Sequence, residues 1–131
     1  MTLLLDTNIW FKHYWRLPLP KGLPERLAQE SLAISPISVL EVATLIRKGR
    51  LPGIPPLAQW LALAIQGYAL ATLTPEIAAA AGADEWEHQD PADRLIVHTA
   101  RANNLMLAHT DRVIHGRTDL RQVYFQQPAR A

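Results

Sequence analysis

The chain has 131 residues, of which 49% are hydrophobic and 19% charged, a balance typical of one globular domain with a sizeable core. Its net charge of +1 at pH 7 does not by itself point to a class of partner, and the absence of cysteine excludes disulfides and thiolate metal sites. No apolar run approaches the length of a membrane span. The N-terminus has no basic leader and reaches Asp6 too early for a signal peptide, so we expect a cytoplasmic protein that does not enter the membrane.

The first third of the chain predicts two strands and two helices. Residues 3–5, LLL, form an apolar run typical of a strand buried in a parallel sheet, and a first helix is expected over 8–14. The Pro- and Gly-containing segment 17–24 is predicted to be a connector. A helix over 25–32 and a strand over 32–35 follow.

The middle of the chain predicts two further helices and a strand. An amphipathic helix is expected over 36–48, ended by Gly49. Its apolar stripe consists of Val39, Val42, Ala43 and Ile46. A rigid connector over 51–56 then precedes an apolar helix over 57–66 and a strand over 69–73.

The last third predicts a short alanine-rich helix over 75–82, capped by Thr74, and a loop over 82–89. A helix over 91–103 begins after Asp90, which is placed to cap it. Strands are expected over 105–108 and 123–125.

Strands and helices alternate along the whole chain, which predicts a single-domain α/β/α sandwich with a central, mostly parallel sheet. We expect this domain to cover residues 1–126 and a short tail to cover 127–131. Ligands of such sheets bind outside the carboxyl ends of the strands. Asp6 directly follows the first predicted strand and is therefore expected at that edge.

Two candidate acids follow predicted strands. Asp6 is either a helix cap or a functional carboxylate, and its neighbours Thr7 and Asn8 are equally suited to a turn. Asp111 follows the strand over 105–108 and is, taken alone, explained by a turn before a short helix.

Two more candidate acids lie on predicted helices. Ser38 and Glu41 match a capping box, although Ser35 followed by proline already offers a cap and would place both residues inside the helix. Asp93 borders the apolar stripe of its helix and needs a partner, either a metal ion or Arg94, unless it only complements the helix dipole.

Together these acids make a stronger case than each does alone. Four carboxylates gathered at one sheet edge would repel one another and require cations. Hard oxygen ligands favour Mg²⁺ or Mn²⁺, and a pair of such ions suits phosphodiester hydrolysis. Outside the four acids the chain would carry a charge of +5, which weakly favours a polyanionic substrate.

The order of these motifs resembles the PIN-domain nucleases, most closely the VapC-type toxins of toxin–antitoxin pairs. The resemblance rests on LLLDTN, S-x-x-E, H-x-D-P-x-D-R and an apolar strand followed by TDRVI, and it covers residues 3 to 114. It implies a Mg²⁺- or Mn²⁺-dependent ribonuclease that cuts RNA, often tRNA or rRNA. It also implies a homodimer and a cognate antitoxin whose tail enters the active-site groove.

The resemblance also implies roles for individual residues. The metal-binding and catalytic acids are Asp6, Glu41, Asp93 and Asp111. The supporting polar residues are Thr7, Asn8, Ser38 and Thr110. One position departs from the family, because His109 stands where Ser or Thr is common two residues before the last aspartate. Either Thr110 takes that role through a shifted turn or His109 contributes to the site.

Four other residues have open roles. Arg94 and Arg112 each follow a proposed ligand and would either bind substrate phosphate or pair with an acid; pairing is favoured for Arg94 and substrate for Arg112. His88 is interpreted as a loop hydrogen-bonder rather than a general base. Trp86 is the preferred tryptophan for a contact with substrate or partner.

Two other functions remain as alternatives. One is a phosphotransfer enzyme with Asp6 as nucleophile, although the second aspartate or acidic pair that such enzymes use is missing. The other is a non-catalytic PIN-fold domain that binds RNA or protein, against which the intact set of acids argues.

Overall fold

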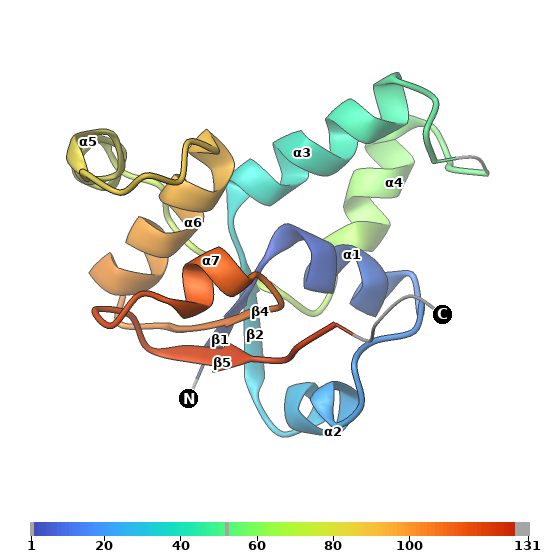
Figure 1. Ribbon diagram of the computed structural model, residues 1–131. Coiled ribbons are helices and arrows are strands. Elements are labelled where there is room, and N and C mark those ends of the chain that lie inside the picture. Colours follow the sequence, from blue (N-terminus) through green and yellow to red (C-terminus); the bar gives the residue numbers. More distant parts are fainter. Residues whose placement is uncertain (1, 52, 128–131) are drawn as a thin grey trace.

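The structure, a computed structural model, describes residues 2–51 and 53–127, and Figure 1 shows its arrangement. Five strands form one sheet in the order β3-β2-β1-β4-β5, and every strand pair in it is parallel. The strands are β1 (Thr2–Leu5), β2 (Ser31–Ile34), β3 (Ala69–Leu70), β4 (Met106–His109) and β5 (Gln122–Tyr124). The predicted parallel α/β architecture is therefore confirmed.

Seven helices accompany the sheet in the described part of the chain. They are α1 (Thr7–Tyr14), α2 (Leu23–Ala28), α3 (Pro36–Arg47), α4 (Leu57–Ala64), α5 (Pro75–Ala83), α6 (Pro91–Ala102) and α7 (Arg112–His115). Within residues 2–51 and 53–127, no helix combines the length and the apolar content needed to cross a bilayer.

Side chains of β1 supply both faces of the sheet, because successive residues of a strand point to opposite sides. Leu3 and Leu5 belong to a core shared with α1, α2, α3 and α4, in which Trp10 and Trp60 are buried. Leu4 belongs to a second core, shared with α6 and α7. The three leucines are completely buried, as the LLL run predicted. The two cores on opposite faces confirm the α/β/α sandwich.

Side-chain caps fix where several helices begin. Ser35 accepts a hydrogen bond from the amide of Ile37 at 3.2 Å and so starts α3, which places Ser38 and Glu41 inside the helix. Thr74 and Asp90 cap α5 and α6 as predicted. The caps at Ser35 and Asp90 fix the first residues of α3 and α6, and this decides which side chains of each helix face the adjacent elements.

Some predicted boundaries were wrong. The helix expected over 25–32 begins at Leu23, because Gly22 adopts φ 90° and Pro24 is tolerated in the first turn. The strand expected over 69–73 stops at Leu70, because β2, its partner, ends where Ser35 caps α3. The short helix that one interpretation of Asp111 placed after it is present as the four-residue α7.

The proposed tail over 127–131 lies outside the described residues except for Gln127, and residue 52 of the predicted connector also lies outside them.

Candidate active site

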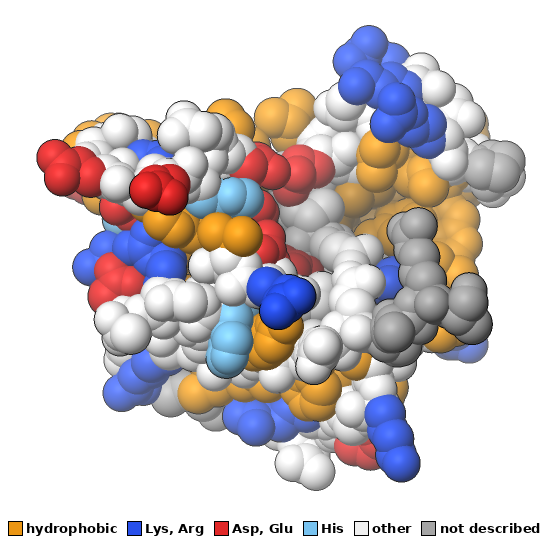
Figure 2. Space-filling view, in the orientation of Figure 1, with side chains coloured by type: hydrophobic (Ala, Val, Ile, Leu, Met, Phe, Trp, Pro, Cys, Tyr) orange, Lys and Arg blue, Asp and Glu red, His pale blue; other side chains and the backbone are white. Residues whose placement is uncertain are grey.

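A pocket of about 460 Å³ lies at the carboxyl ends of the central strands and contains all four predicted acids. Asp6 follows β1 and Asp111 follows β4, so these two acids leave neighbouring parallel strands at the same edge. Glu41 comes from α3 and Asp93 from α6, two helices that pack against each other. Figure 2 shows acidic side chains gathered in a hollow at the centre of this face.

Asp6 is the most deeply buried of the four acids, with 9% of its surface exposed. Its Oδ1 accepts a hydrogen bond from the amide of Ile9 at 2.8 Å and caps α1. Burial is the main cause that raises the pKa of Asp6 from 3.8 to about 7, and the charges of Asp93 and Asp111 add to this effect. The capping and the functional interpretations of Asp6 are thus compatible.

Glu41 is tied to the start of α1. The hydroxyl of Thr7 donates to Glu41 Oε1, and the Thr7 oxygen lies 2.8 Å from the Ser38 hydroxyl. Burial raises the pKa of Glu41, while the hydrogen bond from Thr7 opposes the increase. Thr7 therefore holds the Glu41 carboxylate directly, and Ser38 holds Thr7. Asn8 lines the same pocket.

Asp93 is hydrogen-bonded to His88, whose Nε2 lies 2.6 Å from Asp93 Oδ2. Burial raises the pKa of Asp93, and this hydrogen bond opposes the rise. Ligand atoms of His88, Asp93 and Asp111 all lie within 4.8 Å of one another. The hydrogen bond agrees with the interpretation of His88 as a loop hydrogen-bonder, although no sequence pattern had paired it with Asp93.

Asp111 caps α7, since its Oδ1 accepts from the amide of Val113 at 2.8 Å. The imidazole of His109 is fully buried behind the site. Its Nδ1 accepts from the Asp111 amide at 3.1 Å, and its Nε2 donates to Gln122 at 2.7 Å. His109 thus holds the backbone of Asp111, and Thr110 lines the pocket.

The described residues that line the pocket include four carboxylates and neither Lys nor Arg. Burial, and to a smaller extent neighbouring acids, raises the pKa values of Asp6 and Asp93, so added positive charge in the pocket would favour their ionised forms. Carboxylate, hydroxyl and amide oxygens are the donor set that Mg²⁺ and Mn²⁺ prefer. The residues present therefore fit a divalent ion.

Arg94 does not take either of the roles expected for it. Its guanidinium donates to backbone carbonyl oxygens of the 81–88 segment and lines a separate hollow between α5 and α6. The interpretation as a phosphate ligand or as the partner of an acid is corrected, because its N–H groups are used by the backbone. Arg112 is exposed at the start of α7, next to Asp111.

Trp86 is also placed differently from the expectation. It is half-buried, with the guanidinium of Arg117 4.6 Å from its ring centroid and the ring of His88 4.9 Å away. It packs against the core on the α6 side of the sheet. This environment is that of a structural residue.

Sequence and structure comparisons agree with this site. The sequence profile described as PIN domain matches residues 3–119. The chain belongs to the PIN-domain family.

The similar proteins include a named ribonuclease and solved VapBC structures. It is 32% identical to Ribonuclease VapC22 of Mycobacterium tuberculosis over 117 residues, which cover 85% of this chain and 88% of that protein. Its fold is similar to VapBC2 of Rickettsia felis, solved with a promoter DNA fragment, with a TM-score of 0.72 at 16% identity and coverage of 96% and 100%. It is also similar to VapBC-1 of Haemophilus influenzae, with a TM-score of 0.66 at 21% identity and coverage of 95% and 98%. The predicted family is therefore confirmed.

Proposed function

We propose that this PIN domain is a Mg²⁺- or Mn²⁺-dependent endoribonuclease that hydrolyses RNA phosphodiester bonds. The observation that carries the proposal is the convergence of Asp6, Glu41, Asp93 and Asp111, from four distant segments, in one pocket without a protein cation among its described lining. The nuclease domain is assigned to residues 1–126 and the tail to 127–131.

The acids divide into a buried and an outer group. Asp6 would hold an ion from the floor of the pocket, with Glu41 and Asp93 on the flanking helices and Asp111 on the opposite side. When bound, divalent ions activate water for attack on the phosphate and offset negative charge on the phosphate and the leaving oxygen. Thr7 and Ser38 keep the Glu41 carboxylate in place, and His109 keeps Asp111 in place.

Positive charge outside the pocket supports a nucleic acid substrate. Arg47, Lys48 and Arg50 are exposed at the end of α3, and Figure 2 shows basic side chains gathered over that end. Arg112 extends the positive surface on the other side of Asp111. Such residues bind phosphates through a salt-dependent electrostatic term without regard to sequence.

Cleavage of RNA in the presence of Mn²⁺ tests the function. Asp6→Asn and Asp93→Asn are each expected to remove most of the activity without unfolding the protein. Asp90→Asn is the matched control, because Asp90 caps α6 without lining the pocket and asparagine also caps helices. Unchanged cleavage in the first two variants would refute the proposal. RNA affinity without any cleavage by the wild type would favour the non-catalytic alternative, and acid-stable phosphorylation of Asp6 the phosphotransferase.

Exposed apolar side chains support protein partners. Leu40 on α3 and Leu57 on α4 expose 60% and 58% of their surface, so both helices present large apolar side chains to the solvent. A cognate antitoxin and a second copy of this chain are the partners proposed, in a cytoplasmic complex. Growth arrest on expression, relieved by co-expression of the adjacently encoded antitoxin, tests the first, and light scattering of the purified protein tests the second.

A further inference from the structure

The loop between α5 and α6 brings a histidine side chain next to two acids of the pocket, Asp93 and Asp111. His88 lies on this loop, and its Nε2 and Asp93 Oδ2 are 2.6 Å apart. Both side chains are largely buried, with 20% and 23% of their surface exposed. Because an ionised carboxylate can only accept, the imidazole donates in this contact.

The contact has the length of a hydrogen bond and not that of two ligands on one ion. Adjacent ligand atoms of an octahedral ion, each ~2.1 Å from it, stand ~3 Å apart. The imidazole N–H and the Asp93 carboxylate are closer than that, so they bind each other. An ion would then be held through Oδ1, the other oxygen of Asp93.

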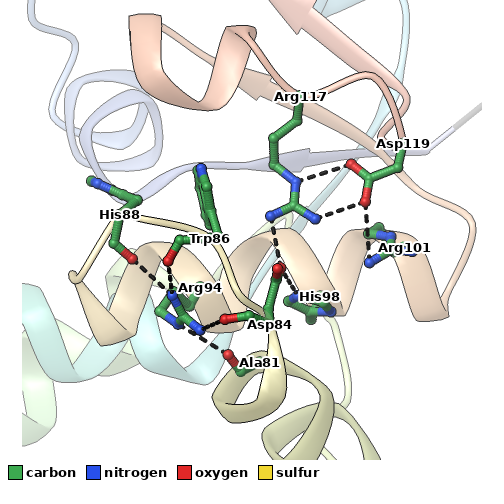
Figure 3. Close-up of polar contacts among 9 residues, drawn as sticks. All are labelled: Ala81, Asp84, Trp86, His88, Arg94, His98, Arg101, Arg117 and Asp119. Atoms are coloured by element: carbon green, nitrogen blue, oxygen red, sulfur yellow. Dashed lines mark hydrogen bonds and ion pairs between the residues drawn. The ribbon is translucent and has the colours of Figure 1, made fainter.

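One guanidinium fixes the backbone of this loop. Arg94 donates from Nε to the carbonyl of Ala81 at 3.0 Å and from Nη1 to those of Trp86 and His88 at 2.8 and 3.0 Å. Its Nη2 donates to the carbonyl of Asp84. Figure 3 shows the four carbonyls converging on Arg94. The residue next to Asp93 therefore holds the backbone from which His88 reaches Asp93.

A second tie joins the loop to the segment that follows α7. Asp84 Oδ2 accepts from His98 Nε2 and from Arg117 Nη1, each at 2.7 Å. Arg117 also donates to both carboxylate oxygens of Asp119 and covers the ring of Trp86 (Figure 3). Hydrogen bonds from His98 and Arg117 hold the pKa of Asp84 at about 2, so this tie is charged throughout the neutral range. It connects the loop that carries His88 with the segment that follows Asp111.

We propose that His88 is a positioning residue, held by Arg94 and by the Asp84–Arg117 tie, that fixes the Asp93 carboxylate for a divalent ion. The inference rests on the proposed metal-dependent function and deepens it. Removing such an outer partner of a metal ligand costs 10- to 100-fold in metal affinity in other proteins. Because the proposed effect depends on the hydrogen bond to Asp93, another side chain with an N–H donor should be able to replace His88.

Calorimetric titration of the full chain with MnCl₂, in the absence of RNA, tests the inference. His88→Ala is expected to weaken Mn²⁺ binding about tenfold, whereas His88→Gln, which keeps an N–H donor, should recover most of the affinity. Gln89→Ala, an exposed neighbour on the same loop, should bind like the wild type. Asp84→Asn, which weakens the charged tie, should lower the affinity by less than His88→Ala.

Binding of Mn²⁺ by His88→Ala at wild-type affinity would overturn the inference, as would His88→Gln no better than His88→Ala. Thermal melts of the metal-free variants separate loss of affinity from loss of fold, because Asp93 positioning predicts weaker Mn²⁺ binding by His88→Ala in a protein that still melts cooperatively, and near-wild-type binding and melting by His88→Gln. If the wild type bound no Mn²⁺, both the inference and the metal-dependent function would fall. If it bound Mn²⁺ with this variant pattern but cut no RNA, only the function would fall.

Discussion

Replacing Asp6 by asparagine should raise the free energy of unfolding of the metal-free protein at pH 8. The Asp6 carboxyl is buried, and its Oδ1 caps α1 by accepting from Ile9 at 2.8 Å. Asparagine retains an oxygen that can accept this hydrogen bond and is an equally good cap. It removes the negative charge whose burial beside Asp93 and Asp111 is unfavourable.

The size of the effect follows from the pKa of Asp6. The carboxyl titrates at about 7 in the folded protein and at 3.8 in the unfolded chain, so the folded state keeps its proton to higher pH. Stability is therefore lost as pH rises between these two values, by about 1.4 kcal/mol per pH unit. The full loss is on the order of 4 kcal/mol, and asparagine does not suffer it.

Urea denaturation with EDTA at pH 5, 6.5 and 8 measures the effect. The half-buried imidazole of His13 and the buried one of His109, whose pKa values burial lowers, titrate in both proteins and cancel in the difference. The advantage of Asp6→Asn over the wild type should grow with pH and reach a few kcal/mol at pH 8. Asp6→Ala should show the same pH dependence but lie about 1 kcal/mol below Asp6→Asn, because alanine cannot cap. A difference independent of pH, or a wild type more stable than Asp6→Asn at pH 8, would refute the reasoning.

Three further predictions concern the supporting residues and the metal. Arg94→Met should lower the free energy of unfolding, measured in urea, by about 3 kcal/mol, because four backbone carbonyls lose a charged donor. A loss under about 1 kcal/mol would contradict a stabilising role of these hydrogen bonds. His109→Leu should cost about 2 kcal/mol, since Gln122 Oε1 and the Asp111 amide lose their partner, and its Mn²⁺ affinity by calorimetry should also fall. Mn²⁺ at 100 times its dissociation constant should stabilise the wild type by about 2.7 kcal/mol in thermal or urea melts; an equal gain in Asp6→Asn would place the ion elsewhere.

The sequence predicted the sheet and the acids because both depend on local patterns. Fully apolar runs such as residues 3–5 indicate buried strands, and an acid directly after such a run must lie at the carboxyl edge of a parallel sheet. The sequence alone did not decide whether Glu41 belongs to a capping box. The Ser38-x-x-Glu41 spacing is present whether the helix begins after Ser35 or after Ser38. The structure resolves this through the cap at Ser35.

The supporting contacts could not be predicted, because they join residues through irregular backbone. Arg94 uses carbonyls of a loop, and no pattern of side chains identifies carbonyl acceptors. Trp86 was predicted to contact substrate or a partner because it lies in the loop before Asp93, but Arg117, 31 positions later, covers its ring. The strand β3 ends at Leu70 because its partner β2 ends at Ile34. The sequence of β3 alone carries no information about where its partner strand stops.

The central position of β1 in the sheet has a consequence for synthesis of the protein. Asp6 is made first, but the strand that flanks β1 on one side is β4, which comes late in the chain and is followed by Asp111. The ribosome must therefore reach β4 before β1 gains its second neighbour in the sheet and Asp111 can join Asp6. A chain cut before β4 lacks both this strand pairing and the last of the four pocket acids.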